Sequence, residues 1–220
     1  MSFNQAGDLR PPEIDNSTSK SNFEPAFRGN PAGNKLIMAL ARGALRLFGW
    51  RLVGLYPEYP KFVAIGAPHT SNWDFILAML IIAGFGVRAS WMAKHTLFRP
   101  PFGWFFYALG GIPIDRSSPH NVVEQAAAAF AKNETLIIGI TPEGTRSRVA
   151  YWKSGFYHLA RLAEVPIVMC YFDYGRKQTG LGDILQPSGN IEADMEFIKA
   201  FYTDKMARHP DKFGQVRVKP

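Results

Sequence analysis

Short apolar runs alternate with longer segments of helical periodicity from about residue 60 to residue 206. The apolar runs at 61–67, 87–94, 111–115, 135–141 and 165–172 have the length and composition of buried strands. The segments at 72–83, 119–132, 154–163 and 191–206 fit helices, with a less regular, aromatic-rich segment at 102–109. This alternation predicts an α/β fold: a single domain with a mostly parallel sheet and helices on both faces.

The segment that begins at residue 34 predicts an amphipathic helix with one basic edge. At about 100° per residue, Lys35, Arg42 and Arg46 fall close together, opposite an apolar face that includes Leu40 and Phe48. Two interpretations remain open. The helix either packs on the core with its cations in solvent, or lies in a lipid interface where its cations meet anionic headgroups.

The 220 residues fit one domain with extensions at its ends. Residues 1–33 are rich in Pro, Asn, Ser and Gly, and they hold too few apolar side chains to offset the entropy of ordering. We therefore expect a flexible N-terminal arm over 1–33, the domain over 34–210, and a C-terminal tail over 211–220. No secretory leader is recognisable, and the longest apolar stretch, 75–87, is shorter than the roughly 20 residues that cross a bilayer.

The charge balance favours an anionic partner, since 25 Lys and Arg stand against 18 Asp and Glu. Nucleic acid, a lipid headgroup surface and a phosphorylated substrate all fit this balance. The basic residues are dispersed and form no recognisable nucleic-acid module, so we expect no nucleic-acid binding. The single cysteine, Cys170, excludes an internal disulfide and a multi-thiolate metal site and fits a cytoplasmic location. The histidines lack the spacing of a zinc site, and we expect no metal.

The first strand runs into the sequence A-P-H-T-S-N-W-D-F, which places His69 at the strand end and Asp74 in the first turn of the next helix. In the turn, the carboxylate can reach the imidazole, hold it in one tautomer and stabilise its protonated form. The pair would then act as a general base. The competing interpretation is a capping aspartate beside a structural histidine.

Two more polar turns follow strands. The strand at 135–141 ends in T-P-E-G-T-R-S, where Glu143 and Arg146 flank a glycine and the guanidinium suits phosphate oxygens. Arg116 follows the strand at 111–115 in the sequence G-G-I-P-I-D-R. Because the carboxyl ends of parallel strands lie at the same edge of a sheet, we expect these turns to converge. Lys94 and Lys153 are possible further cations near the site, although each also fits a solvated lysine.

Four blocks in this order resemble the glycerolipid acyltransferases of the lysophosphatidic acid acyltransferase (PlsC-like) type. They are H-T-S-N-W-D at 69–74, G-G-I-P-I-D-R at 110–116, P-E-G-T-R-S at 142–147 and V-P-I at 165–167, and together they span about half of the chain. The resemblance implies that His69 is the catalytic base and Asp74 its orienting carboxylate. It also implies an acceptor-binding set, which consists of Arg116, Glu143, Gly144, Thr145 and Arg146.

The resemblance further implies an enzyme of phospholipid biosynthesis. It would move a fatty acyl group from acyl-CoA or acyl carrier protein to the hydroxyl of a phosphate-bearing lyso-lipid, by default 1-acylglycerol-3-phosphate. Thioester transfer of this kind needs no cofactor, and backbone amides at a helix N-terminus could receive the oxyanion charge. We expect peripheral contact with an anionic membrane. The alternative is a catalytically silent protein that only binds phospholipid headgroups.

Overall fold

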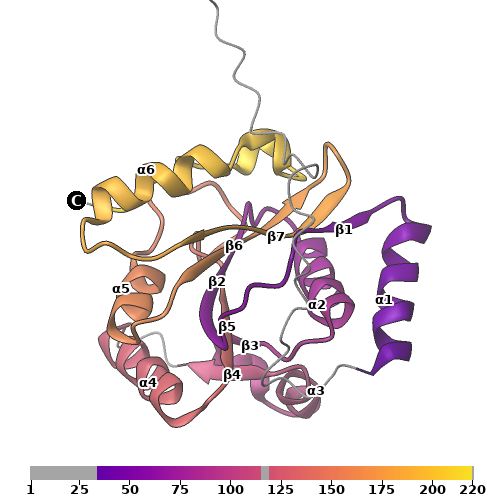
Figure 1. Ribbon diagram of the computed structural model, residues 1–220, viewed down its shortest axis with the longest axis horizontal. Helices are drawn as coiled ribbons and strands as arrows, with labels where there is room; N and C mark the ends of the chain where they lie inside the picture. The colour runs from indigo at the N-terminus through magenta and orange to yellow at the C-terminus, as the bar shows by residue number, and fades with distance from the viewer. Residues whose placement is uncertain (1–33, 115–118, 220) are drawn as a thin grey trace, which may run out of the picture.

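The computed structural model describes residues 34–114 and 119–219, which form a seven-stranded sheet with helices on both faces (Figure 1). The strand order is β1–β7–β6–β2–β5–β3–β4, and every neighbouring pair is parallel except the antiparallel β6–β7 hairpin. The predicted fold class is thus confirmed. The strands are β1 (Arg51–Val53), β2 (Lys61–Ala67), β3 (Ser90–Lys94), β4 (Gly111–Ile114), β5 (Leu136–Ile140), β6 (Ile167–Asp173) and β7 (Gln178–Leu185).

The helices divide between the two faces of the sheet. The helices are α1 (Lys35–Leu47), α2 (Trp73–Phe85), α3 (Gly103–Ala108), α4 (Pro119–Lys132), α5 (Gly155–Leu162) and α6 (Ile191–Phe201). Helices α4, α5 and α6 pack on one face, and α1 and α2 lie on the other, with α3 beyond the β3–β4 edge (Figure 1). Short 3-10 turns occur at His95–Phe98, Asp204–Met206 and Pro210–Lys212.

Strand β2 is central because its side chains are buried on both faces. Val63 and Ile65 join the larger core under α4, α5 and α6, whereas Phe62 and Ala64 point to the other face and pack with Leu181 of β7. The residue that follows β2 is therefore carried by a strand fixed from both sides. This rigidity matters for the site, since the first polar motif begins two residues later.

Helix α1 packs on the domain along one side and leaves apolar side chains exposed along the other. Asn34 caps it by accepting a hydrogen bond from the Leu36 amide, and Ala41 and Leu45 are buried toward α2. Leu47, by contrast, is 81% exposed. Arg42 differs from the expected solvated edge, because its Nε donates to the carbonyl of Gly84 at the end of α2.

The structure differs from the predicted elements in three places. Strands β1 and β7 were not predicted, because β1 has only three residues and β7 carries two glycines and an aspartate. The last helix ends at Phe201 rather than near residue 206, since Tyr202 turns into the core and its hydroxyl donates to the carbonyls of Ile65 and Cys170. The segment at 211–219 lies against the domain, with Val216 buried in the larger core.

The expected N-terminal arm at 1–33 lies outside the described residues. Within the described part of the chain, no helix is long and apolar enough to cross a membrane.

Candidate active site

The polar motifs leave the sheet at one edge. β2 and β5 are parallel neighbours, with Ile65 beside Ile140, so the turns that follow Ala67 and Ile140 emerge next to each other. β6 flanks β2 on the other side, with Ala67 beside Tyr171. The topology therefore brings the first motif and the E-G-T-R-S motif together, as the strand-end argument predicted for these two turns, and it also places the end of β6 beside them.

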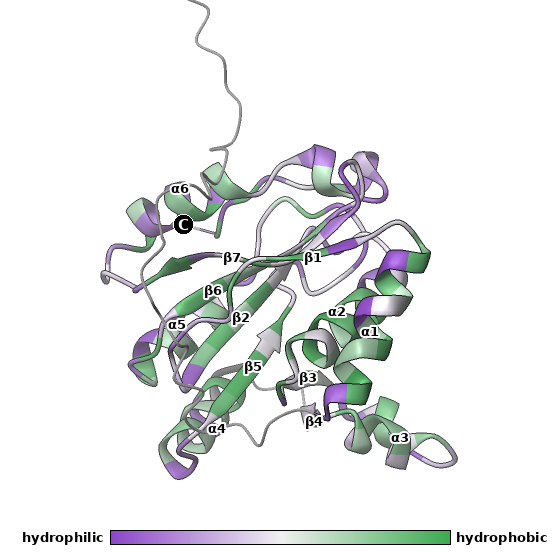
Figure 2. Cartoon of the chain, turned by 45° about the vertical axis from the view of Figure 1, so that its right-hand side comes forward, coloured by the Kyte–Doolittle hydropathy of each residue, from purple (hydrophilic) through white to green (hydrophobic). Residues whose placement is uncertain are grey.

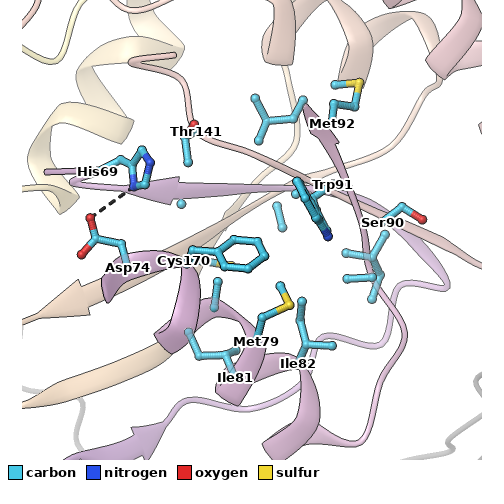
Figure 3. Close-up of a pocket in the computed structure, with 18 of the residues that line it drawn as sticks. His69, Asp74, Met79, Ile81, Ile82, Ser90, Trp91, Met92, Thr141 and Cys170 are labelled. Atoms are coloured by element: carbon cyan, nitrogen blue, oxygen red, sulfur yellow. Dashed lines mark hydrogen bonds and ion pairs between the residues drawn. The ribbon is translucent and has the colours of Figure 1, made fainter. Parts of the chain in front are cut away.

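His69 and Asp74 form a hydrogen-bonded pair. Nδ1 of His69 lies 3.2 Å from Oδ2 of Asp74, which sits in the first turn of α2 (Figure 3). Asp74 is 1% exposed and His69 is partly exposed. Because Nδ1 faces the carboxylate, Nε2 is the ring nitrogen left to accept a proton.

The Asp74 carboxylate is fully engaged. Oδ2 also accepts hydrogen bonds from the backbone amides of Thr70 and Ser71, each at 2.8 Å, and Oδ1 accepts one from the Tyr174 hydroxyl at 2.7 Å. The Trp73 amide donates to the Ser71 hydroxyl. These amides before and at the start of α2 are thus already bonded, which argues against their use for an oxyanion.

Glu143 holds the loop that carries His69. Its Oε1 accepts a hydrogen bond of 2.9 Å from the His69 amide, while Oε2 is buried with no hydrogen-bond partner among the described residues. Burial raises the pKa of Glu143 to about 7, although the bonded amides and the nearby His69 lower it in part. Glu143 therefore carries a carboxyl group that changes charge near neutral pH.

The remaining residues of the E-G-T-R-S motif lie at the same place. Gly144 has a left-handed φ of 66°, and a Cβ atom there would lie 2.9 Å from Cε of Lys153. Lys153 thus covers Gly144, whereas Thr145 and Arg146 are exposed. Lys94 lies exposed at the end of β3, outside the lining of the cavity described next.

Arg116 lies outside the described residues.

A cavity of about 700 Å³ extends from these motifs into the space between α2 and the sheet. Its polar end includes His69, Asp74 and Arg146. Figure 3 shows Met79, Ile82 and Trp91 farther along it. The rest of the lining is mainly apolar and comes from α2, the sheet strands and the loops beside them: Tyr56, Phe62, Phe75, Ala78, Phe85, Val87, Ile137 and Leu181.

Tyr174 is the site residue that the motif analysis missed. It follows β6 directly, at the same edge of the sheet as the other motifs, and that position was the available signal. Nothing local distinguishes it from other tyrosines, because its partner Asp74 lies 100 residues earlier in the chain.

The arrangement has the geometry of a catalytic site in which a histidine is oriented by a buried carboxylate. The histidine can take a proton from a hydroxyl, the cation nearby suits an anionic group, and the apolar cavity suits a hydrocarbon chain. These properties together fit acyl transfer between lipid-like molecules.

Comparison with known proteins gives the family. A family model described as Acyltransferase matches residues 55–173, more than half of the chain. The chain belongs to the acyltransferase family, which confirms the prediction from the four motifs. Its fold is similar to the crystal structure of the 1-acyl-sn-glycerophosphate (LPA) acyltransferase, PlsC, from Thermotoga maritima, with 21% sequence identity over 74% of this chain and 73% of that chain and a TM-score of 0.51. No curated protein matches the chain.

Proposed function

We propose that the protein transfers a fatty acyl group from acyl-CoA or acyl carrier protein to the hydroxyl of a phosphate-bearing lyso-lipid, by default 1-acylglycerol-3-phosphate. The observation that carries this proposal is the His69–Asp74 pair at the polar end of a large apolar cavity. The cavity volume falls within the range of about 300–1,000 Å³ that is usual for sites of small organic ligands. A base without the cavity would not indicate an acyl substrate.

In the proposed reaction, Nε2 of His69 takes the proton of the acceptor hydroxyl as its oxygen attacks the thioester carbonyl. The tetrahedral intermediate then collapses, the C–S bond breaks, and the leaving thiolate receives the proton from the imidazolium. Asp74 keeps Nδ1 protonated and stabilises the transient positive charge. Attack is direct and involves no acyl-enzyme.

We assign the acceptor phosphate to the cations beside Gly144. Arg146 offers a planar fork of N–H donors, and the Lys153 amine lies over Gly144 close to the same turn. Both side chains are exposed, so they can meet a ligand without first breaking a buried ion pair.

The test is acyl transfer from labelled acyl-CoA or acyl carrier protein to a panel of lyso-lipids. His69→Ala should lower kcat by at least about 10²-fold, the usual contribution of a general base, with a circular dichroism spectrum like that of the wild type. Arg146→Ala should chiefly raise KM for phosphate-bearing acceptors. Near-normal turnover by a folded His69→Ala protein would exclude His69 as the base.

We also propose that the protein works while bound to an anionic membrane through what we call the α1–α3 face. Both views place α1 and α3 on the same side of the molecule, away from α4, α5 and α6 (Figures 1 and 2). The apolar side chains that are exposed on this face are Leu36, Ile37, Leu40, Leu47, Phe48, Phe102, Trp104, Phe105 and Tyr107.

Charge favours lipid as the partner of the α1–α3 face. The segments that carry this face, residues 34–48 and 95–108, contain four Lys or Arg and no acidic residue. Exposed aromatic side chains beside cations are typical of a bilayer interface, where the rings enter the headgroup region and the cations attract anionic lipids.

Vesicle sedimentation tests the membrane proposal. Phosphatidylglycerol-containing vesicles should bind the protein and release it in high salt or detergent. Leu47→Asp should weaken binding, whereas Leu162→Asp, which alters a residue of 59% exposure on α5, should not. An absence of vesicle binding at every salt concentration would remove the proposal.

A further inference from the structure

We propose that Tyr174 is a positioning residue for the catalytic base: its hydroxyl fixes the orientation of Asp74 and thereby the orientation and basicity of His69. This inference rests on the proposed function, in which His69 is the base. It assigns a role to a residue outside all four sequence motifs.

The Asp74 carboxylate has one oxygen for the base and one for Tyr174. Oδ2 receives the His69 ring and two backbone amides, all from the turn before α2. Oδ1 receives the Tyr174 hydroxyl at 2.7 Å, from the turn that joins β6 and β7. Tyr174 adds an anchor from a separate part of the chain, so the plane of the carboxylate is held at both of its oxygens rather than at Oδ2 alone.

The Tyr174 ring is itself held in place. Trp50 meets it edge to face, with ring centroids 4.9 Å apart and an interplanar angle of 88°. On another side, Cζ of Arg208 lies 5.9 Å from its centroid and 5.5 Å from the ring of Trp73, the residue before Asp74. The hydroxyl is therefore delivered to Asp74 by a packed ring rather than by a loose surface side chain.

Tyr174 acts as a donor throughout the useful pH range. Burial, then the hydrogen bond to Asp74 and the charge of Asp74, raise the pKa of Tyr174 well above its ordinary value, and Arg208 offsets only part of this. The charged or titratable groups that face Tyr174 are thus Asp74 and Arg208. Those that face His69 are Asp74 and Glu143, with Arg146 at the same end of the cavity.

The hydrogen bond from Tyr174 also changes how strongly the His69 imidazole holds its proton. A hydrogen bond to Oδ1 withdraws electron density from the carboxylate and weakens its attraction for a protonated imidazole. Without that bond, Asp74 would hold the His69 proton more strongly. Loss of the Tyr174 hydroxyl should therefore misorient the base and also move the acidic limb of its activity profile to higher pH.

The chain offers a matched control in Tyr157. Its hydroxyl donates to Oδ2 of the buried Asp194 at 2.8 Å, and Asp194 also accepts from the Ser188 amide. This pair repeats the Tyr174–Asp74 chemistry between α5 and α6, outside the lining of the cavity. Tyr157→Phe should cost stability without changing the base.

The experiment compares wild type, Tyr174→Phe, Tyr157→Phe and His69→Ala in acyl transfer from acyl-CoA to 1-acylglycerol-3-phosphate across pH. Tyr174→Phe should lower kcat by roughly 10- to 100-fold, the range expected for a hydrogen bond to a charged group, with KM nearly unchanged. The acidic limb of kcat/KM should move to higher pH. Tyr157→Phe should keep the wild-type kcat and limb while its midpoint of thermal unfolding falls.

A fourth variant, Arg208→Met, covers the case in which Tyr174→Phe does not fold. This substitution alters an exposed side chain and leaves the Tyr174 hydroxyl in place. It should move the acidic limb of kcat/KM to higher pH, by a smaller amount than Tyr174→Phe. If His69→Ala is inactive while Tyr174→Phe keeps the wild-type kcat and the wild-type acidic limb of kcat/KM, the positioning role alone is overturned. Active His69→Ala would instead overturn the proposed function.

Discussion

Replacing Glu143 with glutamine should remove a pH-dependent loss of stability. Glu143 is 7% exposed, and only one of its two carboxyl oxygens has a hydrogen-bond partner among the described residues. Burial raises its pKa from the usual 4.5 to about 7. Glutamine preserves the acceptor oxygen for the His69 amide and cannot ionise, so it isolates the cost of the buried charge.

The direction in which stability changes with pH follows from the number of protons that the folded and unfolded chains bind. Because the pKa of Glu143 is higher in the folded than in the unfolded chain, the folded protein binds more protons between pH 4.5 and about 7. The contribution of Glu143 to stability is full below pH 4.5 and is lost as the pH rises through 7. A rise in pKa from 4.5 to about 7 corresponds to about 3 kcal/mol of folding free energy, of which about 2–3 kcal/mol is lost between pH 5 and pH 8.

The assay is the free energy of unfolding in guanidinium chloride at pH 5, 6, 7 and 8. Relative to wild type, Glu143→Gln should gain about 2–3 kcal/mol from pH 5 to pH 8, and this comparison cancels any cost of the buried amide that does not vary with pH. Glu134→Gln, which alters an exposed glutamate, should show a flat difference. An equally flat difference for Glu143→Gln would refute the buried-charge argument.

Two further predictions concern the cavity and the turn beside it. Ala78→Phe should narrow the cavity and shift the donor preference toward shorter acyl chains, measured with acyl-CoA species of graded length; an unchanged preference would argue against an acyl chain in this cavity. Gly144→Ala should cost roughly 1–3 kcal/mol, because φ is 66° and the new Cβ would press on Lys153, and it should raise KM for the acceptor; unchanged unfolding and KM would contradict this account.

The elements predicted most accurately were those fixed by local pattern. β2 appears at Lys61–Ala67 and α4 at Pro119–Lys132 with the predicted bounds, since both combine a clear apolar pattern with a turn or proline at the start. β7 was not predicted, because its residues Q-T-G-L-G-D-I-L have little strand propensity. Pairing with β6 and β1 stabilises that strand, and such tertiary pairing leaves no mark in the local sequence.

The candidate site divides in the same way. The spacing of His69 and Asp74 indicated a pair because the contact is local, closing within one turn at the start of α2. The bond from the His69 amide to Glu143 crosses 74 residues, and nothing in either motif indicated it. The apolar cavity also could not be predicted, because the sequence of α2 is that of an ordinary buried helix. The space between α2 and the sheet depends on side chains from several strands.

The contacts also explain how one edge of a sheet can hold the His69 side chain in a fixed orientation. A histidine in a surface turn is normally free to rotate, but here three separate turns constrain it. The turn after β2 supplies the ring and two amides, the turn after β5 supplies the Glu143 carboxylate, and the turn after β6 supplies Tyr174. Since β5, β2 and β6 are consecutive neighbours in the sheet, their ends cannot separate without breaking the central core. The orientation of His69 is thus coupled to the packing of the central core.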